Sequence, residues 1–531
     1  MDQPFSEDTA ATAALVDRAR QHALGDLLRR TALRVPGKLA VVDGPRRFTF
    51  AEFEAAANHF AHALAARGLR KGDRLALLSH NCWQYGALAF ATAKLGVLLV
   101  PVNFMLGADE IAYLLRHAEV AAFVAEGALE PTARKALELA ELGDVVRGRI
   151  GAGGEWEDVD GWLSEGDATA PEVFVADDDP LRIMYTSGTE SRPKGVLLSS
   201  RSLLSQYVSC VIDGGMSADD VEVHSLPLYH CAQLDCFFSV DVYLGATSVL
   251  LPGPDPAALL AAVERERATK LFAPPTVWIS LLRHENFDHT DLSSLRKGYY
   301  GASAMPVEVL RELRRRLPDV ELWNFYGQTE MAPLATILRP HEQLDRAGSA
   351  GRPSLNVETR IVDDEDRPVA PGVVGEIVHR SPHATLGYYR DEDKTAEAFR
   401  AGWFHSGDLG VVDEDGYLSV VDRKKDMIKT GGENVASREV EEALYLLDGV
   451  AEAAVFGISH PHWIEAVTAV VVPREGVTLT TEQVIDHAKS HLAGYKCPKY
   501  VVFTERLPKN PSGKIVKREL RERHKGLAAS G

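Results

Sequence analysis

Hydroxyl side chains, a glycine and a lysine gather in the segment YTSGTESRPKGV, residues 185–196. Such a set can surround phosphate oxygens with backbone N–H groups, hydroxyls and one ammonium. The segment departs from the common nucleotide-loop pattern GxxxxGK[ST], because Pro193 replaces the second glycine and Gly195 follows the lysine. An ordinary polar turn is the alternative. The segment predicts a phosphate-binding loop of another class, built from Thr186, Ser187, Gly188, Thr189 and Lys194.

Two further segments offer groups that suit a nucleotide. NFYGQTE, residues 324–330, supplies an aromatic face for a purine, a hydroxyl for a phosphate oxygen and a carboxylate for Mg²⁺. GASAMP, residues 301–306, begins with a glycine that allows backbone to approach a ligand closely. Taken singly, each is weak, and a surface loop or a β-turn explains it as well. The candidates are Asn324, Tyr326, Thr329 and Glu330, with Gly301, Ala302 and Ser303.

Charged residues near the C-terminal end form a third group. Asp408, in WFHSGDLG, lies beside a tight glycine turn, where a carboxylate can accept two ribose hydroxyls. Arg423 follows in VDRKKD, and Lys514 lies in PKNPSGKIVKREL, residues 508–520. A surface ion pair is the alternative for Arg423, and a solvated side chain is the alternative for Lys514.

In chain order, these segments resemble the motifs of the adenylate-forming superfamily, which includes acyl-CoA synthetases, nonribosomal-peptide adenylation domains and beetle luciferases. The first segment is similar to YTSGTTGxPKGV, with Glu190 and Ser191 in place of Thr and Gly. YGQTE matches YGxTE, and SGD matches TGD with Ser406 in place of threonine. At least five motifs occur in the family's order over almost the full length, which is far more specific than any one of them.

The resemblance implies a role for each matched residue. Tyr326 would stack on adenine, Thr329 would meet the α-phosphate, and Asp408 with Arg423 would hold the ribose. Lys514, Thr329 and Glu330 are the catalytic candidates, with Glu330 as the Mg²⁺ ligand. Lys425 matches the hinge. The residues of KTGGENV expected to serve thioester formation are Lys429, Gly431, Gly432 and Asn434.

The resemblance further implies a two-step reaction. ATP would convert a carboxylic acid into an acyl-AMP with loss of pyrophosphate, and the thiol of CoA would then attack the activated carbonyl. Transfer to a carrier protein or to an amine is the first alternative. A non-catalytic acyl or nucleotide binder is the second, and Lys514 and Glu330 argue against it. ATP, Mg²⁺ and CoA are the expected cofactors.

The sequence identifies the acid substrate less clearly than it identifies the reaction. PLYHCAQLDCFF, residues 227–238, resembles the segment that lines the acyl pocket, with His230 at the gate. A buried structural histidine is the alternative. Gly301 and Gly327 would leave room for a chain or ring, and no tryptophan stands at the gate. The expected substrate is a medium or long fatty acid, which would place the enzyme in fatty acid metabolism, or a bulky organic acid.

The elements that must position these residues follow an α/β rhythm. A helix over 51–68, a strand over 74–79, a helix over 83–95 and the strand VLLVPV predict helices that cover a mainly parallel sheet. After about residue 425, a short amphipathic helix and three strands indicate a separate α+β fold, with a capping box at Thr480 and Gln483. We expect a large N-terminal adenylation domain of layered sheets with helices (1–421), a hinge (422–425) and a small mobile C-terminal domain (426–531).

Composition excludes other classes of protein. The 531 residues carry a net charge of -18, which disfavours general binding to nucleic acid. Five cysteines without a CxxC pair predict reduced thiols. The longest apolar region, 85–104, is interrupted by Lys94 and Pro101, so no transmembrane segment is expected. The start MDQPFSEDTA lacks the apolar stretch of a secretory signal, and these features predict a cytoplasmic protein.

Overall fold

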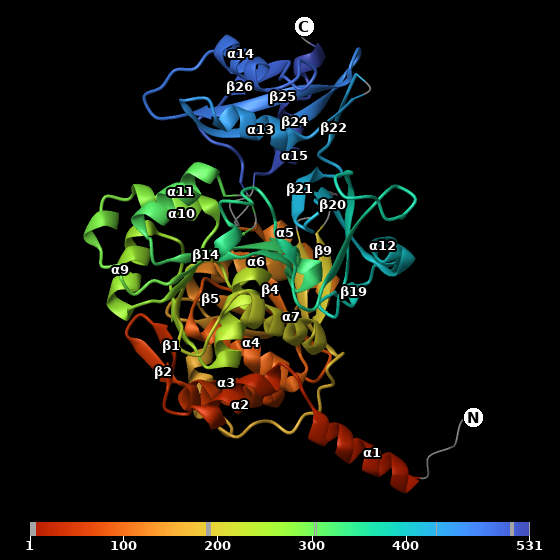
Figure 1. Ribbon diagram of the computed structural model, residues 1–531. Coiled ribbons are helices and arrows are strands. Elements are labelled where there is room, and N and C mark those ends of the chain that lie inside the picture. Colours follow the sequence, from red (N-terminus) through yellow and green to blue (C-terminus); the bar gives the residue numbers. More distant parts are fainter. Residues whose placement is uncertain are drawn as a thin grey trace. The chain divides into compact units, whose positions relative to one another are not determined.

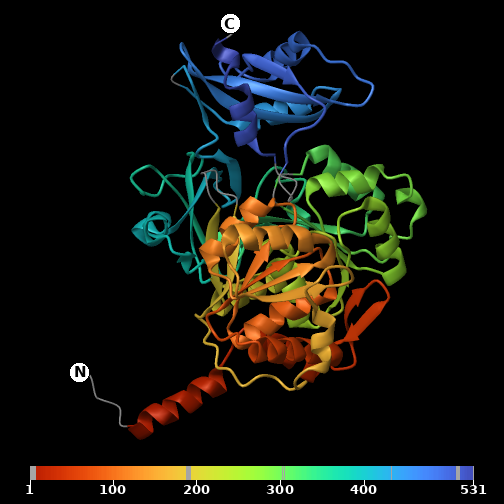
Figure 2. The ribbon, with the colours of Figure 1, turned by 180° about the vertical axis from the view of Figure 1, so that it is seen from behind.

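The computed structural model describes residues 7–186, 193–301, 303, 305–431, 433–509 and 515–529. The chain divides into two compact units (Figures 1 and 2). The first contains the chain up to Glu358 together with Arg380–Glu397. The second contains Thr359–His379 and the chain from Ala398 onward.

Two large sheets form the first unit. The order of the nine-stranded sheet is β16 (Arg352–Pro353), β15 (Leu334–Leu338), β14 (Glu321–Gly327), β13 (Lys297–Gly301), β12 (Lys270–Phe272), β10 (Val221–His224), β11 (Thr247–Leu250), β1 (Leu39–Asp43) and β2 (Arg46–Thr49). The order of the eight-stranded sheet is β19 (Gly387–Tyr388), β9 (Lys194–Ser199), β8 (Pro180–Thr186), β4 (Leu98–Val102), β3 (Arg74–Leu78), β5 (Ala122–Glu126), β6 (Val146–Ile150) and β7 (Glu157–Asp158).

Most strands of both sheets are parallel, and their carboxyl ends carry the candidate loops. β10, β12, β13 and β14 are consecutive parallel neighbours, and β8 is parallel to β4. β9 runs antiparallel to β8, so that Thr186 and Lys194 pair across the ladder. In open α/β sheets, ligands bind outside the carboxyl ends of the strands. Thr186, Gly301 and Gly327 each end such a strand.

Helices fill the space between the two sheets and cover their outer faces. The helices of this unit are α1 (Glu7–Arg20), α2 (Gly25–Arg34), α3 (Phe50–Ala66), α4 (Trp83–Leu95), α5 (Ala108–Ala118), α6 (Glu130–Ala140), α7 (Ser200–Asp213), α8 (Ser239–Leu244), α9 (Pro256–Glu266), α10 (Pro275–Arg283), α11 (Val307–Arg316) and α12 (Glu392–Ala398, which ends in the second unit). A π-helical segment, Ala232–Phe238, leads directly into α8.

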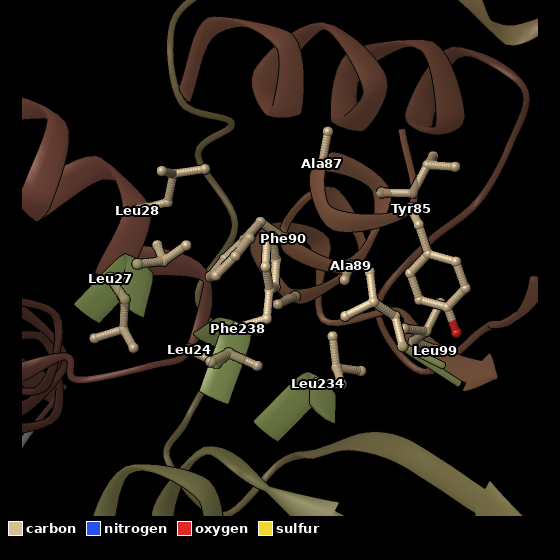
Figure 3. Packing of buried hydrophobic residues seen from close by; sticks show 14 of the residues in the cluster. Leu24, Leu27, Leu28, Tyr85, Ala87, Ala89, Phe90, Leu99, Leu234 and Phe238 are labelled. Atoms are coloured by element: carbon tan, nitrogen blue, oxygen red, sulfur yellow. The ribbon is translucent and has the colours of Figure 1, made fainter. Parts of the chain in front are cut away.

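The largest hydrophobic core lies between the two sheets. Residues of α2, α4 and the π-helical segment interlock there, including Leu27, Phe90, Leu234 and Phe238 (Figure 3). Residues on the outer faces form two separate cores, one under α9, α10 and α11 and one under α5 and α6. Every residue of α4 is buried, because helices and both sheets surround it. A helix with no exposed face is apolar all round, and this one carries only Lys94 as a charge.

The second unit contains two smaller sheets. One has the order β17 (Glu358–Val362), β18 (Gly375–Arg380), β20 (Phe404–Val412) and β21 (Leu418–Arg423). The other has β23 (Glu433–Val435), β22 (Ile428–Thr430), β25 (Ile464–Pro473) and β24 (Val450–His460), with β26 (Tyr500–Phe503) parallel to β25. Its helices are α13 (Ser437–Tyr445), α14 (Thr481–His491) and α15 (Lys517–His524).

The structure confirms the sequence expectations for individual elements. α3, β3, α4 and β4 occupy the predicted stretches, and the predicted capping box opens α14. All five cysteines are free thiols. Within the described residues, no helix combines the length and the apolar character that crossing a bilayer requires. The mixed α/β fold with a large and a small part agrees with the prediction, while the exact division at 422–425 stays a prediction.

Candidate active site

The first unit brings one set of predicted residues together at the ends of β8, β9 and β14. Lys194 Nζ lies 5.2 Å from the centre of the Tyr388 ring. The Tyr388 hydroxyl donates a hydrogen bond of 3.0 Å to Glu330 Oε1. The backbone N–H of Thr385 donates to the carbonyl of Glu330 at 2.7 Å. Lys194 and Glu330, which are far apart in the sequence, are thus linked through one tyrosine.

Thr329 lies beside Glu330 in the short 3₁₀ helix Thr329–Met331. Its Oγ1 is 3.3 Å from Cys231 Sγ, at the start of the π-helical segment. Burial raises the pKa of Cys231 to about 12, so this thiol is protonated at neutral pH and is no nucleophile. Cys231 therefore packs against the catalytic candidate Thr329 as a neutral side chain.

Glycines at the carboxyl ends of β13 and β14 have a packing reason of their own. A Cβ at Gly301 would lie 2.5 Å from the carbonyl oxygen of Phe325, and a Cβ at Gly327 would lie 1.9 Å from that of Pro333. Any larger residue would therefore push neighbouring backbone apart. Room for an acyl group at these glycines stays a prediction. Asn324 donates to the carbonyl of Ser349 at 3.1 Å, which fixes the strand just before Tyr326.

His230 begins the turn that leads into the π-helical segment. It is half-buried, and its backbone carbonyl accepts a 3.0 Å hydrogen bond from Leu234. Its ring lies 6.3 Å from that of Tyr229. His230 is therefore not sealed in the core, and its role as a gate stays a prediction.

The second unit brings Asp408 and Arg423 together. They are partners across β20 and β21, and Arg423 Nε lies 2.6 Å from Asp408 Oδ1. Gly407 has φ +69°, the left-handed conformation that the tight turn before Asp408 requires. Ser406 Oγ accepts from the Asp408 N–H at 3.0 Å and donates to the Ile377 carbonyl at 2.6 Å. The predicted pairing of these two residues thus has a geometric basis, and their own ion pair is part of it.

The candidates for the thioester step form a hairpin in the same unit. Lys429 and Asn434 are cross-strand partners in β22 and β23, and Gly431 has φ +60°. The Gly431 N–H donates to the Trp463 carbonyl at 2.9 Å. Lys425 lies in the turn between β21 and β22, where Asp426 forms a 2.6 Å ion pair with Arg521. The hinge at Lys425 stays a prediction.

Several predicted residues lie outside the described part of the chain: Ser187, Gly188, Thr189, Ala302, Gly432 and Lys514, together with the substituted positions Glu190 and Ser191. Their roles stay predictions. Sequence reasoning missed Tyr388 and Cys231 as neighbours of Glu330 and Thr329. No local motif marks Tyr388, because only the pairing of β19 with β9 brings it to this place.

Comparisons with known proteins show the family of the chain. Residues 28–389 match the family model of the AMP-binding enzyme, and residues 439–514 match the AMP-binding enzyme C-terminal domain. The chain is 37% identical over 505 residues to a feruloyl-CoA synthase from an Amycolatopsis species, covering 95% of this chain and 99% of that protein. It is 35% identical over 508 residues to an indoleacetate–CoA ligase from Aromatoleum aromaticum, covering 94% and 98%.

A solved amide bond synthetase from Marinactinospora thermotolerans is similar over 94% of this chain and 99% of its own, with 31% identity and a TM-score of 0.84. The first family model covers the motifs at 185–196, 301–306 and 324–330, and the second ends at Lys514, whereas the motifs at 403–435 lie between the two matched ranges. The chain therefore belongs to the AMP-binding, adenylate-forming enzymes and is an acid–thiol ligase of the acyl-CoA synthetase type.

Proposed function

We propose that this enzyme uses ATP and Mg²⁺ to convert a bulky carboxylic acid into an acyl-AMP and then transfers the acyl group to CoA. The observation that carries the proposal is the linkage of Lys194, Tyr388 and Glu330 at the carboxyl ends of the strands. The Lys194 ammonium, which can bind phosphate, therefore lies in the same region as the Glu330 carboxylate and the neighbouring Thr329 hydroxyl. These groups suit a nucleoside triphosphate better than they suit a neutral ligand.

The chemistry explains why these groups are needed. A carboxylate resists nucleophiles because it is anionic and would have to expel oxide. Its oxygen attacks the α-phosphorus of ATP, the bond to pyrophosphate breaks, and AMP becomes a good leaving group. Lys194, Thr186 and Thr329 stabilise the phosphate charge that would otherwise repel the acid, and Lys514 is assigned to bridge the acid and the α-phosphate. The CoA thiol then attacks the carbonyl, and AMP leaves.

Glu330 is the residue that would hold Mg²⁺. A carboxylate oxygen is a ligand that Mg²⁺ prefers, and the Tyr388 hydrogen bond to Oε1 fixes the orientation of this one. The bound ion would offset negative charge on the phosphates. The Glu330 side chain is only half-buried, which suits a group that must meet a hydrated ion.

The second unit is assigned the ribose and the thioester step. Asp408 is only 4% exposed, and its ion pair with Arg423 fixes the orientation of its carboxylate, which would accept hydrogen bonds from ribose hydroxyls. The β22–β23 hairpin, with Lys429 and Asn434, is assigned to the pantetheine arm. Movement about Lys425 would exchange the two tasks, because Lys514 serves the first step and the hairpin serves the second.

The names of the relatives favour an aromatic or other bulky acid over a plain fatty acid as substrate. The two relatives act, by name, on feruloyl and indoleacetate groups, both of which carry rings. A medium or long fatty acid remains the second choice. A cytoplasmic location belongs to the same proposal, since free thiols persist in reducing compartments.

Amide formation is the second candidate function, and the likeness to the amide bond synthetase supports it. The acyl-AMP would then react with an amine. Transfer to a carrier-protein thiol is the related possibility. All share the first step and differ only in the acceptor.

The test incubates the enzyme with ATP, Mg²⁺ and a panel of aryl, arylpropanoic and fatty acids. Pyrophosphate release reports the first step, and mass spectrometry with CoA, amines or carrier protein reports the acceptor. We expect an acyl-CoA product from aryl or arylpropanoic acids. Pyrophosphate release with no thioester under any CoA condition would count against CoA as acceptor, and an amide product would establish the second candidate.

The roles of the two steps are separated by Lys514→Ala. This variant should slow adenylation by about a hundredfold or more, because it removes a charge that acts in the transition state. It should leave thioester formation from a supplied acyl-adenylate largely intact. Equal loss in both steps would contradict the division of tasks.

A further inference from the structure

Arg182 lies deep between the two sheets and is poorly paired. Its side chain is 1% exposed, and its nearest charge partner is Asp235, with Nη2 3.6 Å from Oδ1. Nε and Nη1 of Arg182 find no hydrogen-bond acceptor among the described residues, and Oδ2 of Asp235 finds no donor there. A buried charge with unused hydrogen-bonding atoms costs several kcal/mol. Two donor nitrogens of Arg182 and one acceptor oxygen of Asp235 therefore have no hydrogen-bond partner among the described residues.

The sequence of β8 places this pair in line with the phosphate site. Strand residues alternate between faces, so Arg182, Met184 and Thr186 share one face of β8, and the ladder with β9 is regular from Arg182 to Thr186. Four residues of strand span about 13 Å. Met184, between them, is buried and apolar. One face of β8 therefore runs from a phosphate-binding end, over an apolar middle, to a cationic end.

The π-helical segment gives a second estimate of the distance between the candidate reactive end and the Arg182–Asp235 pair. Thr329 Oγ1 contacts Cys231 Sγ at 3.3 Å, and Asp235 lies four residues after Cys231 in the same helical run. About one helical turn, or roughly 6 Å, separates these two positions. Asp235 also accepts a hydrogen bond of 3.3 Å from the Tyr207 hydroxyl on α7. Both routes, one of about 13 Å and one of roughly 6 Å, lead from the candidate reactive end to the same pair, and the length of an arylpropanoic acid lies between these two values.

We propose that Arg182 and Asp235 recognise a hydroxyl group at the far end of the acid, so that the preferred substrates are acids whose apolar body ends in a hydroxyl. A hydroxyl matches the unused atoms because it accepts from Arg182 and donates to Asp235 at once. A carbonyl would meet only the arginine, and a methyl would meet neither. The proposal rests on the function proposed above and names its substrate class.

The test compares acids that differ only in that hydroxyl. 3-(4-Hydroxyphenyl)propanoic acid is paired with 3-phenylpropanoic acid, and 7-hydroxyheptanoic acid with heptanoic acid. Dissociation constants are measured by calorimetry, and kcat/KM is measured by pyrophosphate release. In the wild-type enzyme, we expect at least one hydroxylated acid to have a dissociation constant about tenfold or more lower than that of its partner and a kcat/KM about tenfold or more higher, which is a preference ratio of about ten in both measurements. Unmet buried polar groups penalise the analogue that lacks the hydroxyl.

Variants identify the residues that cause the preference. Arg182→Leu combined with Asp235→Leu should bring the ratio to about one or below, mainly through KM, and Arg182→Lys should restore part of it. Asp220→Asn is the matched control. Asp220 is also buried and pairs with Lys297 at 2.8 Å, but it lies next to the amino end of β10, whereas the site lies at the carboxyl ends. This control should change stability without changing the ratio.

Two outcomes would overturn the inference: a wild-type ratio of one or less for both pairs, or a ratio that the double variant leaves unchanged. These are separate from failure of the proposed function. If no acid were adenylated, that function would fall, and the calorimetric ratio would still decide whether the pair binds a hydroxyl.

Discussion

Two aspartates in one continuous helical run, Asp235 and Asp241, are both fully buried, yet the protein treats them differently. Asp241 belongs to a quartet with Glu222, His224 and Lys270, where Lys270 Nζ lies 2.8 Å from Glu222 Oε2 and also contacts Asp241 Oδ1. His224 Nε2 is 3.2 Å from Asp241 Oδ2. Among the residues that the structure describes, the Asp235 carboxylate has only Arg182, at 3.6 Å, and the Tyr207 hydroxyl as partners.

The pKa directions of the two aspartates follow from this difference. Burial alone would raise the pKa of Asp241, but Lys270 and His224 outweigh it and lower that pKa. Burial raises the pKa of Asp235, and Arg182 offsets only part of the rise. Burial also raises the pKa of Glu222 well above its usual range and lowers that of His224. The two carboxyl groups of the quartet thus have pKa values that are shifted in opposite directions, although both lie beside Lys270.

Charge balance explains the quartet without a metal. Glu222, His224 and Asp241 could be mistaken for a metal site, since their ligand atoms lie within 4.8 Å of one another. Lys270 already supplies the cation. We conclude that the quartet is a structural element. The Arg182–Asp235 pair, by contrast, is the one that we propose binds a hydroxyl group of the substrate.

The largest expected effect is that of Lys270→Met on stability. The substitution leaves the Asp241 carboxylate buried without its cation, which should lower the free energy of unfolding by about 3–5 kcal/mol. Urea denaturation measures the change. Arg47→Met is the control, because the ion pair of Arg47 with Glu266 involves a half-exposed arginine side chain, and its loss should cost about 1 kcal/mol or less. Equal losses in both variants would show that the quartet contributes no more to the free energy of unfolding than a surface ion pair does.

Glu222→Gln tests the protonation of the quartet. The folded-state pKa of Glu222 lies above its unfolded value, so wild-type stability from this group is complete below about pH 4.5 and is lost as pH rises through the folded pKa. Glutamine is uncharged at every pH. The variant should therefore gain stability over the wild type as pH increases from 5 to 8, as followed by urea denaturation at each pH. A gain that decreases with pH would contradict the raised pKa of Glu222.

Removing both members of the Arg182–Asp235 pair should cost little stability. Arg182→Leu with Asp235→Leu eliminates two charges and their unmet atoms together, and we expect the free energy of unfolding to change by less than about 1.5 kcal/mol or to increase. Asp235→Leu alone should be worse, since it leaves the arginine buried without a partner. If the double variant were less stable than both single variants, the pair would be structural like the quartet.

The smallest effect is expected from Tyr207→Phe. It removes one hydrogen bond to Asp235 and should cost about 1 kcal/mol. Tyr85→Phe is its matched control, because the buried hydroxyl of Tyr85 has no hydrogen-bond partner among the described residues. That change should be neutral or slightly stabilising. Thermal melting compares the two, and a reversed order would place a partner on Tyr85.

Much of the fold was accessible from the sequence because it depends on local periodicity. α3 and α14 follow from apolar spacing and from capping residues such as Thr480, and α4 follows from the length of its apolar run. Short motifs pointed to Thr329, Glu330, Asp408 and Arg423 as site candidates, since each motif keeps its chemistry within a few residues, and their roles stay predictions.

The sequence by itself determined the family, the reaction type and the residues whose motifs are local. Only the tertiary structure decided which distant side chains contact one another: Tyr388 with Glu330, Cys231 with Thr329, and Arg182 with Asp235. The physical reason is that periodicity and motifs report on neighbours along the chain, whereas partners across sheets depend on strand order and register. A buried charge gains or loses its partner through that arrangement alone.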